Sequence, residues 1–117
     1  MKKQTEEHLQ SQIVQWFNNT YCLKSHEPRL MVFSVPNGGT RNVLEATRMK
    51  ASGVLSGVSD LIVVLPRKVL FVELKLATGR QSKSQIEFES RVTKLGHPYF
   101  VIRSLEEFKE LIRCQKI

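Results

Sequence analysis

The sequence predicts an α/β fold in which helices cover both faces of a mixed central sheet. Helical and strand-like patterns alternate along the 117 residues, and two apolar runs at the centre are joined by the short break Pro66-Arg67-Lys68. This length suits one domain with its own hydrophobic core, so we expect a single domain spanning residues 1–117.

A first helix is predicted over residues 5–19, because apolar side chains recur there at helical spacing: Leu9, Ile13, Trp16 and Phe17. Thr5 can cap its start. Glu6 falls inside the arc of these apolar residues, and Glu7 lies at its edge. Glu6 can therefore face the interior, or it can reach solvent from the first turn, where the helix dipole favours an acid.

A strand and a second helix are predicted next. Residues 30–35 are apolar and β-rich, and the turn-forming residues 36–39 end this strand. A shorter helix is expected over residues 40–52, with a modest apolar face made by Val43, Leu44, Thr47 and Ala51. Gly53 stops this helix, and Gly57 indicates a positive φ angle or a close backbone approach.

The two central runs predict strands over residues 60–65 and 69–75. Both are nearly continuously apolar, which is typical of strands that are buried on both faces. Because the break between them is so short, the two strands should pair in the antiparallel direction.

The rest of the chain predicts a helix, a strand and a closing helix. Ser82 can cap a helix over residues 83–95, and residues 99–103 form the last strand. Ser104 and Glu107 match a capping box at the start of the closing helix. The predicted order is therefore α-β-α-β-β-α-β-α.

Charged residues gather at one end of the central hairpin. Glu73 and Lys75 lie two apart on a strand and point to the same face, and antiparallel pairing can place Asp60 opposite Glu73. Two carboxylates this close repel each other unless a proton or a cation lies between them. Mg²⁺ bound by Asp60, Glu73 and the backbone carbonyl of Leu74 is one solution. A plain salt bridge between Glu73 and Lys75 is the alternative.

Such a cation favours phosphodiester hydrolysis, because it acidifies a bound water and polarises the scissile phosphate. Lys75 can then orient the water or stabilise developing negative charge. Glu6 can hold the ion through a water or bind a second ion. Gln85 lies on the inward face of its helix and can position a ligand or Lys75, although it can equally be a satisfied core amide.

The chain is basic, with 18 Lys and Arg against 11 Asp and Glu and a formal net charge of +7. This charge favours a polyanionic partner such as nucleic acid, although general solubility also explains it. Cys22 and Cys114 lack metal-type spacing, which predicts free thiols and an intracellular, cytoplasmic location. The apolar runs are too short to cross a bilayer, and the first residues lack the apolar region of a signal peptide, so we expect no membrane partner.

The central motif resembles that of the PD-(D/E)XK nuclease superfamily: Asp60, twelve intervening residues, then Glu73-Leu74-Lys75. Gly57-Val58-Ser59-Asp60 is similar to the family's G-V-P-D, with serine in place of proline, and Phe71-Val72-Glu73-Leu74-Lys75 resembles F-x-E-L-K. Ser82-Lys83-Ser84-Gln85 resembles the S-x-x-Q helix start, and Gly96-His97-Pro98-Tyr99 matches the family ending. Together these motifs resemble the virus-type replication-repair nuclease (VRR-NUC) domain over almost the whole chain.

This resemblance implies a restriction-endonuclease-like fold and a DNA nuclease that depends on Mg²⁺ or Mn²⁺. It implies that Asp60 and Glu73 bind the metal, that Lys75 is the catalytic lysine and that Gln85 is the motif glutamine. Glu6 matches the helix-one glutamate of the family better than Glu7. Small stand-alone members from bacteria and their viruses are similar to Holliday-junction resolvases. We therefore expect a structure-specific endonuclease that cuts four-way DNA junctions as a homodimer, in DNA repair.

Other functions remain open. The same fold can act as a flap endonuclease or an exonuclease, the domain can bind DNA without catalysis, or the charges can form a structural salt bridge in a metal-free interaction protein. Candidate contacts to DNA phosphates are Arg41, Lys50, Arg80 and Lys83. Neutralising phosphates in this way would make DNA binding depend strongly on salt.

Overall fold

The computed structural model describes residues 4–36 and 43–117 and has the predicted element order. The helices are α1 (Glu6–Tyr21), α2 (Val43–Ala51), α3 (Lys83–Lys94) and α4 (Leu105–Arg113). The strands are β1 (Met31–Ser34), β2 (Leu61–Leu65), β3 (Lys68–Leu74) and β4 (Tyr99–Ile102). They form a mixed sheet in the order β1-β2-β3-β4, in which β3 and β4 are parallel and the other pairs are antiparallel. The predicted fold class is confirmed.

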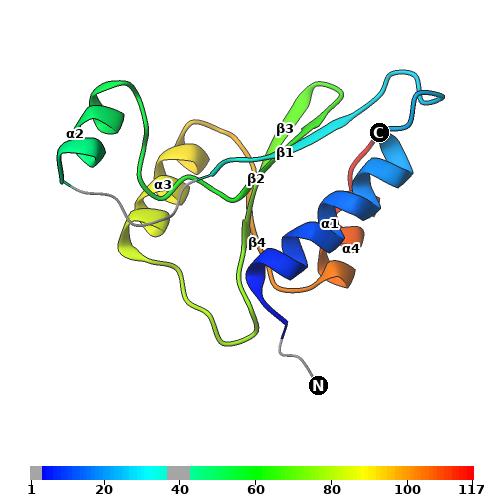
Figure 1. Ribbon diagram of the computed structural model, residues 1–117. Coiled ribbons are helices and arrows are strands. Elements are labelled where there is room, and N and C mark those ends of the chain that lie inside the picture. The colour runs from blue at the N-terminus through cyan, green and yellow to red at the C-terminus, as the bar shows by residue number, and fades with distance from the viewer. Residues whose placement is uncertain (1–3, 37–42) are drawn as a thin grey trace.

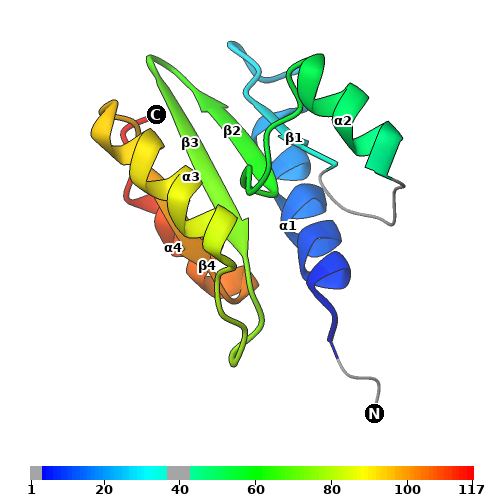
Figure 2. The ribbon, with the colours of Figure 1, turned by 90° about the vertical axis from the view of Figure 1, so that its left-hand side faces the viewer.

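The helices divide between the two faces of the sheet (Figure 1). Helices α1 and α4 lie side by side on one face, and α3 lies on the opposite face (Figures 1 and 2). Helix α2 lies at the left-hand edge of the molecule in Figure 1, on the same side of the sheet as α3. None of the helices in the described ranges is long and apolar enough to cross a membrane.

The main core lies between the sheet and the pair α1 and α4. Its fully buried side chains come from four elements and are Leu9, Ile13, Phe17, Leu61, Val63, Leu70, Val72, Phe108 and Ile112. The rings of Trp16 and Phe108 meet edge to face with centroids 5.9 Å apart. The predicted apolar stripe of the first helix is therefore the face that α1 buries.

The other face of the sheet is covered less completely. Phe88 and Val92 of α3 pack against Tyr99 of β4, and the ring of Phe71 on β3 lies 5.8 Å from that of Phe88. In β2, burial alternates: Leu61, Val63 and Leu65 are buried, whereas Ile62 and Val64 are only partly buried. The expectation that the central strands are buried on both faces was therefore wrong for this side, because α3 packs on β3 and β4.

Helix α2 does not bury the apolar face that its sequence predicts. None of its residues is buried, and Val43 and Leu44 are 84% and 62% exposed. Among the described residues, no helix or strand packs on the apolar residues of this short helix, so helical spacing alone did not place them in the core.

Side-chain caps set the starts of three helices. The hydroxyls of Thr5, Ser82 and Ser104 each accept a hydrogen bond from the N–H group three residues later, at 3.0, 3.3 and 3.1 Å. The predicted box at Ser104 is incomplete, because the Glu107 carboxylate accepts from the N–H of Arg103, one residue before the cap.

Candidate active site

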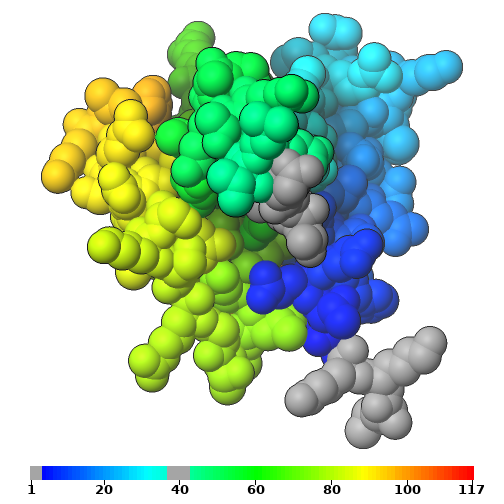
Figure 3. Space-filling view, turned by 60° about the vertical axis from the view of Figure 1, so that its left-hand side comes forward, coloured from blue at the N-terminus to red at the C-terminus, as the bar shows by residue number. Residues whose placement is uncertain are grey.

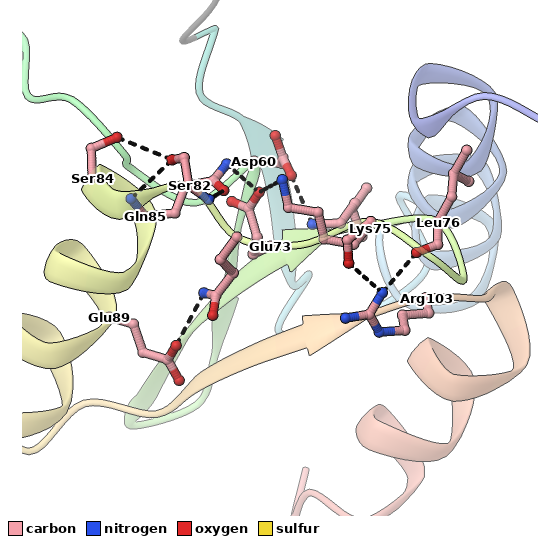
Figure 4. Close-up of polar contacts among 12 residues, drawn as sticks. Asp60, Glu73, Lys75, Leu76, Ser82, Ser84, Gln85, Glu89 and Arg103 are labelled. Carbon is pink, nitrogen blue, oxygen red and sulfur yellow. Dashed lines mark hydrogen bonds and ion pairs between the residues drawn. The ribbon is translucent and has the colours of Figure 1, made fainter.

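The charged cluster lies at the end of β3, beside the entry to β2 and the first turn of α3 (Figure 4). Leu61 pairs with Val72 in the register of β2 and β3, so the next pair along is Asp60 with Glu73. The N–H of Val35 donates to the Asp60 carbonyl at 2.9 Å, which extends the pairing of β1 and β2 to this residue. The hairpin thus brings the two acids together, as the short break between its strands predicted.

Glu73 is a buried acid with one unused oxygen. Its side chain is 1% exposed, and Oε2 accepts a hydrogen bond from Gln85 Nε2 at 2.8 Å. The ammonium of Lys75 lies 3.8 Å from the same oxygen. Oε1 has no hydrogen-bond partner among the residues that the structure describes. A buried carboxylate oxygen without a partner is costly for stability, so Glu73 is a candidate for binding a ligand.

The electrostatics of Glu73 also favour a cation. Burial, followed by the charge of Asp60, raises the pKa of the Glu73 carboxyl from 4.5 to about 8. The Lys75 ammonium opposes this rise in pKa, whereas the charge of Glu6 adds to it. The metal-free site therefore keeps a proton at neutral pH, and a divalent cation would relieve the same repulsion.

Asp60 is partly buried and is held by the backbone of β3. Its Oδ2 accepts a hydrogen bond from the N–H of Leu74 at 2.7 Å. Because the N–H and C=O of one strand residue point to the same edge, the Leu74 carbonyl faces this side too. Asp60 and Leu74 line an open cavity of about 560 Å³ together with residues from the start of α1. Figure 3 shows this face of the molecule, with the start of α1, in blue, beside the yellow-green loop after β3.

These oxygens fit a hard divalent cation. Carboxylate and carbonyl oxygens are the ligands that Mg²⁺ and Mn²⁺ prefer, and Mg²⁺ commonly binds one or two carboxylates and completes its shell with water and phosphate oxygens. The unpartnered Oε1 of Glu73, the carboxylate of Asp60 and the carbonyl of Leu74 provide such a set.

Glu6 lies at the rim of this cavity. Glu6 and Glu7 are both exposed residues of the first turn of α1, and both line the cavity. The charge of Glu6 is the one that contributes to the raised pKa of Glu73. Within residues 4–36 and 43–117, no three His, Cys, Asp or Glu side chains form a group that could hold a metal ion. Metal binding by Glu6 stays a prediction, and its rim position suits contact through a water.

Gln85 links the start of α3 to the acid of β3. Its Oε1 accepts a hydrogen bond from the N–H of Ser82 at 2.7 Å, which completes the capping box of α3. With the carbonyl oxygen used in this way, the Nε2 atom donates to Glu73 Oε2 (Figure 4). Gln85 therefore points inward, as its place on the helix predicted, and it contacts Glu73 rather than Lys75.

Gly57 permits the close approach of α3. Its φ angle is 79°, and a Cβ atom at this position would collide with the carbonyl oxygen of Ser84. Both features that the sequence indicated for this glycine, the positive φ and the close approach, are present. Ser59, where the family pattern has proline, is fully buried, and its hydroxyl donates to the Leu61 carbonyl at 3.3 Å.

The predicted phosphate contacts that the structure describes are Lys50, Arg80 and Lys83, and they lie outside the acidic cluster. Arg80 and Lys83 are exposed at the approach to α3, whereas Arg41 lies outside the described residues. Lys50 lines a second cavity, of about 360 Å³, formed by the segment after α2 and one side of α3. Arg91 lines the same cavity, and no sequence motif indicated this residue.

Sequence reasoning also missed two side chains that hold the loop after β3. Gln81 Nε2 donates to Glu89 Oε1 at 3.0 Å and to the Tyr99 hydroxyl at 3.3 Å. Arg103 Nη1 donates to backbone carbonyls of the loop. Burial, and next the charge of Glu73, raises the pKa of the Tyr99 hydroxyl. Contacts of this kind join distant residues and carry no local sequence signal.

Comparison with known proteins gives one family and two similar structures. The family model of the VRR-NUC domain matches residues 2–106. A solved structure described as a VRR_NUC domain protein has a TM-score of 0.76 and 23% identity, covering 97% of this chain and 88% of that chain. Another, described as a VRR_NUC domain, has a TM-score of 0.65 and 23% identity, covering 95% and 97%. At these identities the likeness shows the fold, and no curated protein matches the chain.

The family match covers every residue of the candidate active site, from Glu6 to Gln85. VRR-NUC domains are nucleases of the PD-(D/E)XK type, which act on DNA and generally use a divalent metal. The chain therefore belongs to the VRR-NUC family of PD-(D/E)XK-type nucleases.

Proposed function

We propose that the protein is a metal-dependent, structure-specific DNA endonuclease that resolves four-way (Holliday) junctions as a homodimer. The cluster of Asp60, Glu73 and Lys75, with an unpartnered buried oxygen on Glu73 within the described chain, carries the catalytic part of this proposal. A buried acid with one oxygen unpartnered among the described residues and a strongly raised pKa is typical of a catalytic or metal-binding position.

Each residue of the cluster has a distinct role in this proposal. Asp60, Glu73 and the Leu74 carbonyl would hold Mg²⁺ or Mn²⁺, which when bound acidifies a water and polarises the scissile phosphate. The side chain of Lys75, 12% exposed, orients the attacking water and offsets negative charge that develops on the phosphate oxygens. Gln85 fixes the Glu73 carboxylate through Oε2 and leaves Oε1 for the ligand.

Junction cleavage and the homodimer are the finer part of the proposal. A four-way junction is roughly two-fold symmetric, so two active sites related by a two-fold axis can cut it at paired positions. The net charge of +7 favours a substrate in which several phosphate backbones converge. We propose that Arg41, Lys50, Arg80 and Lys83 contact these backbones.

Replacement of Lys75 by alanine tests the catalytic assignment. We expect Lys75→Ala to reduce the rate of Mg²⁺-dependent junction cleavage by about 100-fold or more, because an aligned charge-stabilising group is lost. Lys68→Ala is the matched control, since Lys68 lies at the opposite end of β3 and donates to Gln115 Oε1 at 3.0 Å. Cleavage by Lys75→Ala at the wild-type rate would show that the site is assigned wrongly.

Product mapping separates junction resolution from its rivals. Four-way junction, flap and linear duplex of matched sequence are incubated with wild-type protein in Mg²⁺ and in Mn²⁺, and the oligomeric state is measured by light scattering. Paired nicks across the junction by a dimer support the proposal. Preferred cleavage of flaps, or stepwise shortening from ends, supports a flap endonuclease or an exonuclease. Binding of DNA without any metal-dependent cleavage indicates a non-catalytic module.

A further inference from the structure

We propose that Arg103 is a positioning residue for Lys75. It holds the loop that leaves β3, and this loop in turn holds the aliphatic stem of Lys75 in place. The inference rests on the proposed catalytic role of Lys75 and adds a residue that no motif of the sequence indicates.

Arg103 follows β4 directly and binds one loop through several carbonyl groups. Its Nη1 donates to the carbonyl oxygens of Leu76 at 2.7 Å, Gly79 at 2.9 Å and Ala77 at 3.4 Å. Figure 4 shows the guanidinium reaching the loop from the opposite side to the acids. Hydrogen bonds from a charged donor are about twice as strong as neutral ones. In the described part of the chain, no carboxylate forms an ion pair with this guanidinium, so its polar partners are the loop carbonyls.

The loop passes beside the stem of Lys75. A Cβ atom built on Gly79 would lie 3.4 Å from Cδ and 3.5 Å from Cβ of Lys75, so the lysine stem runs past Gly79 at the distance of one added methyl group. The N–H of Lys75 donates to the Ile102 carbonyl at 3.1 Å. Lys75 and Arg103 therefore lie at the same end of the β3 and β4 pairing, with the loop between their side chains.

This arrangement restricts a side chain that is otherwise flexible. A lysine side chain has many rotamers, and only those that leave Nζ beside Glu73 Oε2 are productive in the proposed reaction. Apart from the bonds to Arg103, the loop carries a turn bond from the Gly79 N–H to the Leu76 carbonyl at 2.9 Å. Displacement of a catalytic group by roughly 1 Å can reduce the rate by about 100-fold. Arg103 thus acts on the chemistry through Lys75.

Chemical labelling of lysines in the metal-free protein tests this positioning without requiring activity. Wild type, Arg103→Ala and Arg103→Lys are treated with an amine-reactive reagent, and mass spectrometry gives the labelling rate of Lys75 relative to the exposed Lys83. We expect Arg103→Ala to raise this ratio by about threefold or more, because the loop no longer shields the stem. Arg103→Lys keeps a donor for one carbonyl and should give an intermediate ratio. An unchanged ratio in both variants overturns the inference.

Kinetics on four-way junctions then separates positioning from DNA binding. We expect Arg103→Ala to lower kcat by about 10- to 100-fold with little change in KM, and Arg103→Lys to recover part of the loss. Arg113→Ala, on an exposed arginine of α4, is the control and should match wild type. A raised KM with unchanged kcat would show that Arg103 contacts DNA and would overturn the inference. If wild type cleaves no DNA, the proposed function fails, while the labelling ratio still decides whether Arg103 positions Lys75.

Circular dichroism and thermal unfolding confirm that the variants are folded. If Arg103→Ala does not fold, the comparison of Arg103→Lys with wild type decides the question by the same two measurements.

Discussion

The two faces of the sheet are built from the same kinds of elements but differ in what they bury. On the face of α1 and α4, side chains such as Leu9, Phe17 and Phe108 are 0% exposed. On the opposite face, the smaller cluster of Phe88, Val92 and Tyr99 is 7–8% exposed. Glu73 also lies on this face, where Gln85 of α3 donates a hydrogen bond to it. Stability is concentrated on one face, so the other can hold a buried acid that weakens the fold.

The candidate active site lies where this second face ends. An unpartnered carboxylate oxygen beside a second acid is tolerated only if the rest of the fold supplies enough stability. We expect substitutions on the two faces to change the free energy of unfolding by different amounts. At Glu73 we expect even the sign of the change to differ.

The largest expected loss of stability comes from the main core. Phe17→Ala should lower the free energy of unfolding by about 3–5 kcal/mol, because it removes a fully buried ring and leaves a cavity. Phe88→Ala, in the smaller cluster of the other face, is the matched variant, and its free energy of unfolding should fall by less. Urea unfolding measures both, and equal losses would contradict the comparison of the two faces.

The contact between Gly57 and α3 should be almost as sensitive. Gly57→Ala should lower the free energy of unfolding by about 2–4 kcal/mol, since strain at positive φ adds to the collision with Ser84. Gly53→Ala is the control, because Gly53 also has a positive φ of 105°, but no atom of the described residues lies within 4 Å of an added Cβ. Gly53→Ala should lose only the part of the free energy of unfolding that backbone strain at positive φ accounts for. Thermal unfolding distinguishes the two, and equal shifts would mean that α3 moves away freely.

Glu73→Gln should stabilise the metal-free protein while it abolishes cleavage. The folded pKa of about 8 exceeds the ordinary 4.5, so the fold binds the proton more tightly than the unfolded chain does. The resulting stability is fully present below pH 4.5 and is lost as the pH rises through 8. Removing the charge should therefore add roughly 1–3 kcal/mol near pH 8 and almost nothing near pH 4.5.

Chemical unfolding in EDTA at both pH values measures this difference between Glu73→Gln and wild type. Glu106→Gln, at an exposed position of α4, is the control and should change stability little at either pH. A loss of stability in Glu73→Gln near pH 8 would contradict the assignment of Glu73 as a destabilising buried charge.

The smallest effect is expected on α2. Leu44→Ser should change the free energy of unfolding by less than about 0.5 kcal/mol, because Leu44 is 62% exposed. Unfolding is measured at two protein concentrations. A larger loss that grows with concentration would show that α2 is covered by a second copy of the chain, which would sharpen the homodimer proposal.

The sequence by itself determined the elements and the central pair of acids. Helix starts depend on a capping residue and its near neighbours, so Thr5 and Ser82 could be identified from the sequence. The short break in the hairpin set the pairing that brings Asp60 beside Glu73. Gln85 could also be identified from the sequence, because the helical period places its side chain on the inward face of α3.

Only the tertiary structure decided the environment of these residues. Which face α3 covers, and therefore the incomplete burial of β2 and the exposure of α2, depends on how whole elements pack. The hydrogen bond from Gln85 to Glu73 joins residues 12 positions apart, and the hydrogen bond from Arg103 to the Leu76 carbonyl joins residues 27 positions apart. The structure also shows that Oε1 of Glu73 has no partner among the described residues. Backbone carbonyls are the same in every residue, so no sequence pattern marks them as partners, and only the folded chain brings them within reach of the guanidinium.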